Sequence, residues 1–234
     1  MKAISSMATR LVLSDLADAA ASAGLARPDI ESVGGVDAAD RVAAGERFDL
    51  VFLAQGALTR LGTAGHVDAD SIVPLLLSQT AVAVPSGSDE PAERPEGPAF
   101  ADAVGVRDAL RAASRIGYST GPSGTALVRM IQEWGLEAEL ADRLVQARPG
   151  IPVAASLAAG DVDLGFQQLS ELVGQPGIRI LGVLPADCAI DTVFAGAVAA
   201  TAEDAAAAQT VLDAFRTEEA AAIKAAHNFG VPAV

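Results

Sequence analysis

Short apolar runs alternate with longer amphipathic segments along most of this 234-residue chain. Runs of about four to eight apolar residues are typical of buried strands, and amphipathic segments of about 10–15 residues are typical of helices. Strands are expected at residues 2–6, 29–33, 48–53, 71–77, 80–85, 115–118, 162–166 and 178–185, with another apolar run at 193–200. Helices are expected at residues 9–23, 36–44, 57–65, 106–113, 125–134, 152–159 and 168–173, and one helix or a pair at 203–226. This alternation predicts an α/β protein built from βαβ units, with mostly parallel sheets flanked by helices.

One segment breaks the alternation. Residues 86–98, SGSDEPAERPEGP, are rich in proline, glycine and charge. Such a composition buries too little apolar surface to order itself, so it predicts a solvated loop.

Charge and cysteine content exclude several classes of function. The chain has 16 Lys and Arg against 30 Asp and Glu, a net charge of −14. This balance argues against nucleic acid and against an anionic membrane surface, since both need basic patches. The single cysteine, Cys188, excludes an intrachain disulfide and a cysteine-rich zinc site. His66 and His227 stand in no metal-ligand spacing, so neither a metal nor a cofactor is expected.

The apolar runs are too short for membrane insertion. A membrane-spanning helix needs about 20 apolar residues, and none of the runs approaches that length. The opening sequence MKAISSMATR has Ser, Thr and Arg where a signal peptide would have its apolar region. A cytoplasmic protein is therefore expected, or a periplasmic one if a signal peptide has been removed.

Four strand-to-helix turns carry the candidate chemistry. They contain small, hydroxyl or amide residues: Ser6 with Thr9, Gly35 after Gly34, Gln55 before Gly56, and the segment from Ser119 through Thr120 and Ser123 to Gly124. In open α/β sheets such turns lie at the carboxyl ends of the strands, where ligands bind. The N–H groups of a helix N-terminus can hold a small anion without Lys or Arg. Ordinary helix capping is the alternative for any one turn.

Nucleotide-binding motifs are missing from the sequence. Residues 121–124 lack the Lys and the spacing of a phosphate-binding Walker loop, and no GxGxxG follows the first strand. The sequence therefore does not indicate a nucleotide-binding enzyme.

Several segments, in order, resemble one known family. They are SSMAT, GG before a helix, AGERFDLVFLA, GYSTGPSGTALVRMIQEWGL, LAAGDVDLGFQQLSEL and GVLP. This order is similar to that of the periplasmic molybdate-binding proteins of the type 2 solute-binding superfamily. The resemblance implies a two-lobed fold that closes on a small anion in a cleft between the lobes. Lobe 1 would be residues 1–80 plus 190–234 and lobe 2 residues 81–189, with hinges near 80–85 and 183–193.

The resemblance also assigns residues position by position. Ser6 matches the family's first-loop serine, and Ser123 lies in the anion loop of the second lobe. Gly35 stands where the molybdate binders have a second serine, and Gln168 where they have a tyrosine. Losing these two hydroxyls disfavours tetrahedral molybdate.

A larger carboxylate suits the remaining side chains better. Gln55, Gln167 and Gln168 offer both donors and acceptors, and Arg10 could bind a carboxylate with two hydrogen bonds. Aconitate isomerases are similar to this family, so the resemblance implies an isomerase that shifts the double bond of an unsaturated polycarboxylate. Such an enzyme needs a base, which the sequence leaves unknown; Asp37 and Glu171 are merely near the turns.

Two non-catalytic functions stay open. The first is the substrate-binding component of a molybdate-type ABC importer, which would need a signal peptide upstream. The second, a ligand-sensing module, is disfavoured because no helix-turn-helix segment precedes the lobes.

Overall fold

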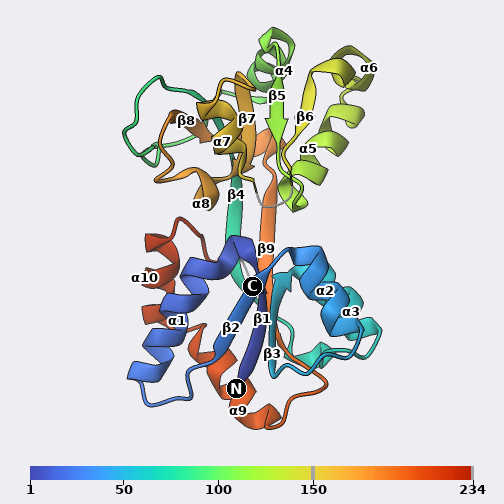
Figure 1. The fold of residues 1–234 in the computed structure, drawn as a ribbon, viewed down its shortest axis with the longest axis vertical. Helices are drawn as coiled ribbons and strands as arrows, with labels where there is room; N and C mark the ends of the chain where they lie inside the picture. The colour runs from blue at the N-terminus through green and yellow to red at the C-terminus, as the bar shows by residue number, and fades with distance from the viewer. Residues whose placement is uncertain (149–150, 233–234) are drawn as a thin grey trace. The chain divides into compact units, whose positions relative to one another are not determined.

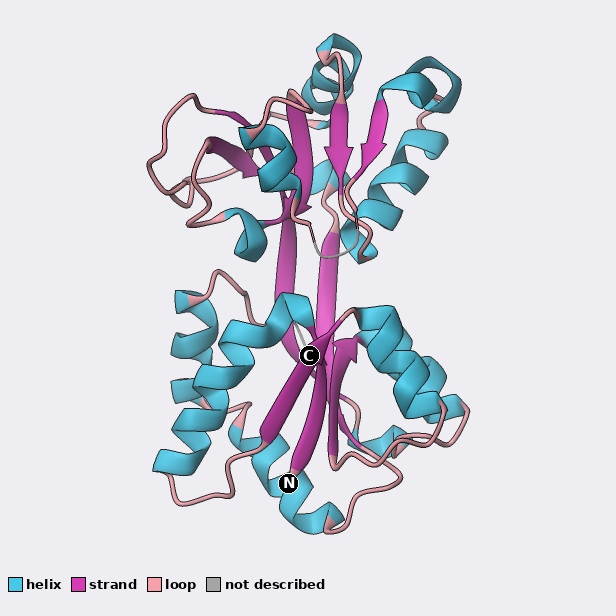
Figure 2. Cartoon of the chain, viewed as in Figure 1, coloured by secondary structure: helices cyan, strands magenta, loops and turns pink. Residues whose placement is uncertain are grey.

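The computed structural model describes residues 1–148 and 151–232. The chain forms two compact units (Figure 1, Figure 2). Unit 1 comprises Met1–Leu77 and Val193–Val234, and unit 2 comprises Ser78–Thr192. The chain passes between the units twice, within the strands β4 (Val73–Pro85) and β9 (Asp191–Val198).

Unit 1 is built on a mostly parallel sheet with the strand order β2-β1-β3-β9. β1 (Lys2–Ser6) pairs in parallel with β2 (Asp29–Val33) and with β3 (Leu50–Ala54), and β9 is antiparallel to β3. Because the first three strands are parallel, their carboxyl ends lie at one edge of the sheet. The helices are η1 (Met7–Thr9), α1 (Arg10–Ser22), α2 (Gly35–Ala43), α3 (Gln55–Thr63), η2 (Ala69–Ser71), α9 (Ala205–Ala214) and α10 (Glu218–Ala226).

Both faces of this sheet are covered by helices. Alternate side chains of a strand point to opposite faces. Phe52 therefore packs with Leu13 of α1 and with Phe215, which follows α9. Its neighbour Val51 points to the other face and packs with Leu58 of α3. Figure 1 shows α1 and α10 on one side of the unit 1 sheet and α2 and α3 on the other.

Unit 2 repeats the plan with its own sheet. β5 (Ile116–Tyr118) pairs in parallel with β6 (Leu144–Gln146) and with β7 (Leu164–Gln168). β4 is antiparallel to β7 and to β8 (Ile178–Val183). The helices are α4 (Ala103–Ala112), α5 (Pro122–Glu133), α6 (Glu137–Leu140), η3 (Ala141–Arg143), α7 (Val153–Ala158), α8 (Leu169–Leu172) and η4 (Ala186–Cys188). One core lies under α4 and α5 and another under α7 and α8.

The predicted fold class, an α/β protein of two lobes, each with a sheet flanked by helices, is confirmed. Two details differ from the expected elements. The strands expected at 71–77 and 80–85 form one strand, β4, because the backbone stays extended through Ser78 and Gln79. The short β6 and α6 were not expected. The segment 203–226, expected as one helix or a pair, is a pair of helices, divided where the Thr217 side chain caps α10.

Two further expectations concern the surface. Residues 86–98 contain neither helix nor strand, as the composition predicts. Within the described ranges, no helix combines the length and apolar character needed to cross a membrane.

Candidate functional site

The carboxyl-end edge of the unit 1 sheet brings Ser6 next to the start of α2. Ser6 is the last residue of β1 and lies opposite Val33, the last residue of β2. A Cβ at Gly35 would lie 3.7 Å from Ser6 Oγ, so this hydroxyl adjoins the first residue of α2. The parallel strands therefore bring together Ser6 and Gly35, which are distant in sequence.

The helices at this edge begin without side-chain caps. Gly34 precedes α2 and Ala54 precedes α3, and neither residue caps its helix. Gly34 has φ −57°, which any residue adopts, and a Cβ at Gly35 or Gly56 would make only ordinary contacts. Neither backbone strain nor packing requires these glycines. Their effect is to leave the first-turn N–H groups open, and such groups bind anions.

The other predicted residues of unit 1 differ in exposure. Thr9 is buried and its Oγ1 donates to the Ser6 carbonyl oxygen at 3.0 Å, so it supports the turn from inside. Arg10, the first residue of α1, is exposed, and it forms no ion pair with any residue of the described ranges. Gln55 is exposed as the first residue of α3.

Unit 2 presents a buried pair of hydroxyls at the carboxyl end of β5. Ser119 Oγ and Ser123 Oγ are 2.9 Å apart, and both side chains are buried. Between them the chain turns into α5, and because its N-cap residue is Gly121, no side chain caps this helix. A Cβ at Gly124 would overlap with the carbonyl oxygen of Ser119, so this turn requires glycine there. Thr120, at the tip of the turn, is exposed.

The Gln167 carboxamide is engaged on both sides. Its Oε1 accepts a hydrogen bond from Val153 N at 2.8 Å, at the start of α7, and its Nε2 donates to Glu171 Oε2 at 2.7 Å. Burial raises the pKa of the Glu171 carboxyl, and the Gln167 hydrogen bond lowers it in part. This geometry favours a supporting role for Gln167 over the predicted direct contact with a ligand.

Gln168 is bound to a residue that the motifs did not indicate. Its Oε1 accepts a hydrogen bond from Ser78 Oγ at 2.9 Å, and both side chains are buried. A carboxamide whose oxygen is engaged in this way presents its NH2 group as a donor. Thr80 lies opposite Gln168 in the β4–β7 ladder. The sequence signal for Ser78 and Thr80 is a pair of hydroxyl residues, two apart, in a mostly apolar strand.

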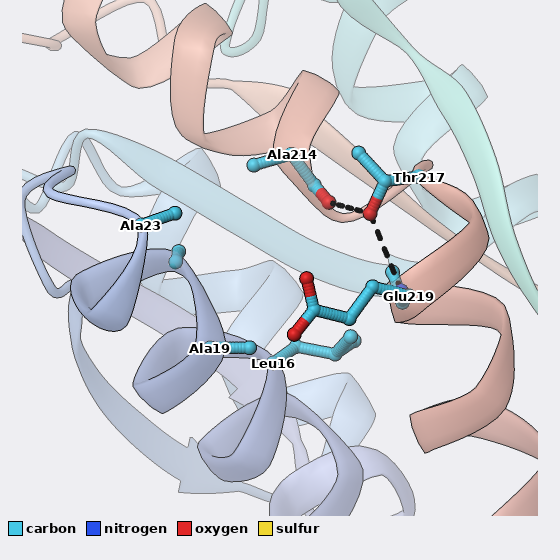
Figure 3. Close-up of a pocket in the computed structure, with 8 residues that line it drawn as sticks. Leu16, Ala19, Ala23, Ala214, Thr217 and Glu219 are labelled. Atoms are coloured by element: carbon cyan, nitrogen blue, oxygen red, sulfur yellow. Dashed lines mark hydrogen bonds between the residues drawn. The ribbon is translucent and has the colours of Figure 1, made fainter.

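Two surface hollows lie away from these turns. A cavity of about 80 Å³ lies between α1 and the α9–α10 corner (Figure 3). There Thr217 Oγ1 donates to the Ala214 carbonyl oxygen at 3.1 Å. A second hollow of about 310 Å³ adjoins Lys2, the first residue of β1, and Phe48, which precedes β3. Neither contains a predicted site residue.

Metal-binding and thiol chemistry find no support in the described ranges. No three His, Cys, Asp or Glu side chains there are grouped to hold a metal ion. Burial, with the neighbouring Asp187, raises the pKa of the Cys188 thiol to about 11, so this thiol is unreactive.

The fold and these turns define a solute-binding protein. The chain belongs to the family of bacterial extracellular solute-binding proteins, whose family model matches residues 2–230. This finding confirms the predicted family.

Individual relatives agree with this assignment. An aconitate isomerase from a Pseudomonas species is 32% identical over 198 residues, which cover 83% of this chain and 71% of the relative. The periplasmic molybdate-binding protein of Azotobacter vinelandii is 20% identical, with a TM-score of 0.75 over 100% of both chains. A substrate-binding domain assigned to a molybdenum ABC transporter of Clostridium difficile is 13% identical, with a TM-score of 0.76 over 100% of this chain and 99% of its own. The two structures show the fold alone.

Proposed function

We propose that this protein binds a small carboxylate through backbone N–H groups and hydroxyls at the carboxyl-end turns of its two units. The observation that carries the proposal is the set of helix N-termini without side-chain caps, where neither the backbone conformation nor the packing requires the glycine that is present. Gly35 beside Ser6 in unit 1 and Gly121 beside Ser119 in unit 2 are the principal examples. Such glycines are explained by an anion that approaches the backbone closely.

The character of the donors favours a carboxylate over a metal oxyanion. Gly35 adds no hydroxyl beside Ser6, which leaves room for a larger ligand. Gln168 adds an amide NH2 group, and Arg10 adds an exposed guanidinium that can bind a carboxylate with two hydrogen bonds. Because the protein carries a net charge of −14, its overall field repels an anion. Local hydrogen-bond donors must therefore attract the carboxylate.

We further propose that the bound ligand is an unsaturated polycarboxylate and that the protein shifts its double bond, as an aconitate isomerase does. The 32% identical relative supports this activity. The reaction breaks a C–H bond next to a carboxylate, moves the double bond, and returns a proton to another carbon. N–H groups at helix N-termini would stabilise the negative charge that develops on the carboxylate side.

The base is assigned to one of two carboxyl groups. Asp37 lies in the first turn of α2 and is exposed. Glu171 is half-buried and accepts a hydrogen bond from Gln167 Nε2, and burial raises the pKa of its carboxyl, which makes its carboxylate a stronger base. Replacing the base with the matching amide should abolish isomerisation while leaving binding within about threefold of wild type.

The test is a thermal-shift screen followed by NMR in D2O. The probes are cis-aconitate, trans-aconitate, citrate, molybdate, sulfate and phosphate. A ligand at 100 times its Kd should stabilise the fold by about 2.7 kcal/mol. Interconversion of cis- and trans-aconitate with deuterium incorporation is the expected result, and Ser123→Ala should weaken binding. If no carboxylate binds, the proposal is wrong.

A second function, an ABC importer's substrate-binding component, is favoured by the family's description as extracellular solute-binding proteins. It predicts tight binding of one probe without isomerisation. If only molybdate or another oxyanion binds, the importer function replaces the isomerase. The cytoplasmic location, the lobe boundaries and the interlobe cleft stay predictions.

A further inference from the structure

We infer that Thr80 is a ligand-binding residue, and that its hydroxyl and the Gln168 amide together bind a second oxygen-bearing group of the ligand. The inference rests on the proposed function, because it adds a contact to that carboxylate site. Ser78 is then a positioning residue that orients the Gln168 amide.

The three side chains share one face of the β4–β7 ladder. In the register of this antiparallel pair, Thr80 lies opposite Gln168 and Val82 lies opposite Phe166. Residues two apart in a strand point to the same face. Val82 and Phe166 belong to the core under α4 and α5, so Thr80 and Gln168 continue this face beyond the core. Ser78, two residues before Thr80, reaches Gln168 Oε1 at 2.9 Å.

The Thr80 hydroxyl of this cluster is buried and unsatisfied. Thr80 is 2% exposed, and its Oγ1 has no hydrogen-bond partner in the part of the chain that the structure describes. The backbone of Thr80 is satisfied, because its N–H donates to Ile190 O at 3.0 Å and its carbonyl accepts from Leu184 N at 2.9 Å. A buried hydroxyl without a partner destabilises a fold, and valine would fill the same space without that cost. A ligand oxygen explains why a hydroxyl stands here.

This cluster lies at the same sheet edge as the anion-binding turn of unit 2. β5 and β7 are parallel neighbours, with Tyr118 opposite Phe166. Ser119 therefore follows β5 at the edge where Gln168 ends β7. A ligand held by the N–H groups of α5 through one carboxylate would direct its next oxygen group toward Gln168 and Thr80. The chemical class is thus a di- or tricarboxylate, or a hydroxy acid, and not a monocarboxylate without a second oxygen-bearing group, such as acetate.

The test compares three variants by calorimetric titration and thermal unfolding. Thr80→Val removes the hydroxyl at constant shape, and Thr80→Ser keeps it. Ser170→Ala is the matched control, because Ser170 Oγ is also buried without a partner among the described residues but lies in α8. The probes are cis-aconitate, trans-aconitate, citrate and acetate.

We expect Thr80→Val to weaken binding of the tricarboxylates at least tenfold while the Tm of the ligand-free protein stays unchanged or rises. Thr80→Ser and Ser170→Ala should bind within about threefold of wild type. Unchanged tricarboxylate affinity in Thr80→Val would overturn the inference and leave the proposed function intact. If Thr80→Val lowers the Tm of the ligand-free protein and Thr80→Ser does not, the hydroxyl has a structural role, and this result would also overturn the inference. If wild type binds no probe, the proposed function itself fails.

Discussion

The groups proposed to bind an anion differ in burial between the two units. In unit 1 the groups are accessible: Gly35 and Gln55 are exposed, and the Ser6 hydroxyl makes no capping bond. In unit 2 they are buried and already paired, as Ser119 is with Ser123. A buried pair fixes donor geometry before a ligand arrives, whereas open N–H groups accept ligands of different shape. Changes in unit 2 should therefore affect both stability and binding, and changes in unit 1 binding alone.

Gly124→Ala should give the largest effect. The new Cβ would overlap with the Ser119 carbonyl oxygen, so the backbone of the turn must move. We expect a loss of about 3 kcal/mol or more in the free energy of unfolding, measured with urea. Gly35→Ala is the matched control in unit 1. A loss below about 0.5 kcal/mol for Gly124→Ala would contradict the rigid turn.

Lys224→Met tests a buried charge that is not among the predicted site residues. Lys224 of α10 is buried and forms no ion pair with a residue of the described segments. Burial, and to a smaller degree Arg216, lowers its pKa from 10.5 to about 8. Because the folded pKa lies below the unfolded one, the charged lysine destabilises the fold fully below pH 8, and this cost is relieved between pH 8 and 10.5.

We therefore expect Lys224→Met to raise the free energy of unfolding at pH 7 by about 2 to 3 kcal/mol. The gain should shrink as pH rises toward 10.5, and ligand affinity should not change. Lys2→Met, at an exposed position, is the control. A gain independent of pH would show that packing, and not charge, is responsible.

Ser123→Ala and Ser6→Ala compare the two units directly. Each should weaken carboxylate binding about tenfold, equivalent to about 1.4 kcal/mol. Only Ser123→Ala should also lower the free energy of unfolding, by about 1 kcal/mol, because it leaves the buried Ser119 hydroxyl unpaired. Calorimetric titration and urea unfolding measure both quantities. Equal stability losses in the two variants would remove the distinction between the units, and unchanged affinity in both would show that the site assignment is wrong.

Gly35→Ala should give the smallest effect. Its Cβ would make an ordinary contact 3.7 Å from Ser6 Oγ, so stability should stay the same or rise by about 0.5 kcal/mol. Carboxylate affinity should fall about threefold, because the methyl group would stand where the ligand approaches the N–H groups. A thermal-shift series against cis-aconitate measures both. A marked loss of stability would mean that packing, and not a ligand, requires this glycine.

More of the fold than of the candidate site could be predicted from the sequence. The apolar run at 48–53 predicts β3, and Gly24 and Gly45 mark the ends of α1 and α2 because a left-handed residue is needed there. Turn composition also indicated Ser6 and Ser123, which lie at the end of β1 and in the first turn of α5 and stay predictions as ligand-binding residues. It could not distinguish Gln167, which is occupied inside unit 2, from Gln168, which offers an amide NH2 group.

Local pattern by itself determined the alternation of strands and helices and the turns at the strand ends, because these depend on neighbours within about ten residues. Only the tertiary structure decided which polar groups meet. Ser78 and Gln168 are 90 positions apart in sequence, and the β4–β7 register that joins them leaves the Thr80 hydroxyl buried and unpaired. Register is set by long-range pairing of strands, and periodicity within one strand carries no information about its partner.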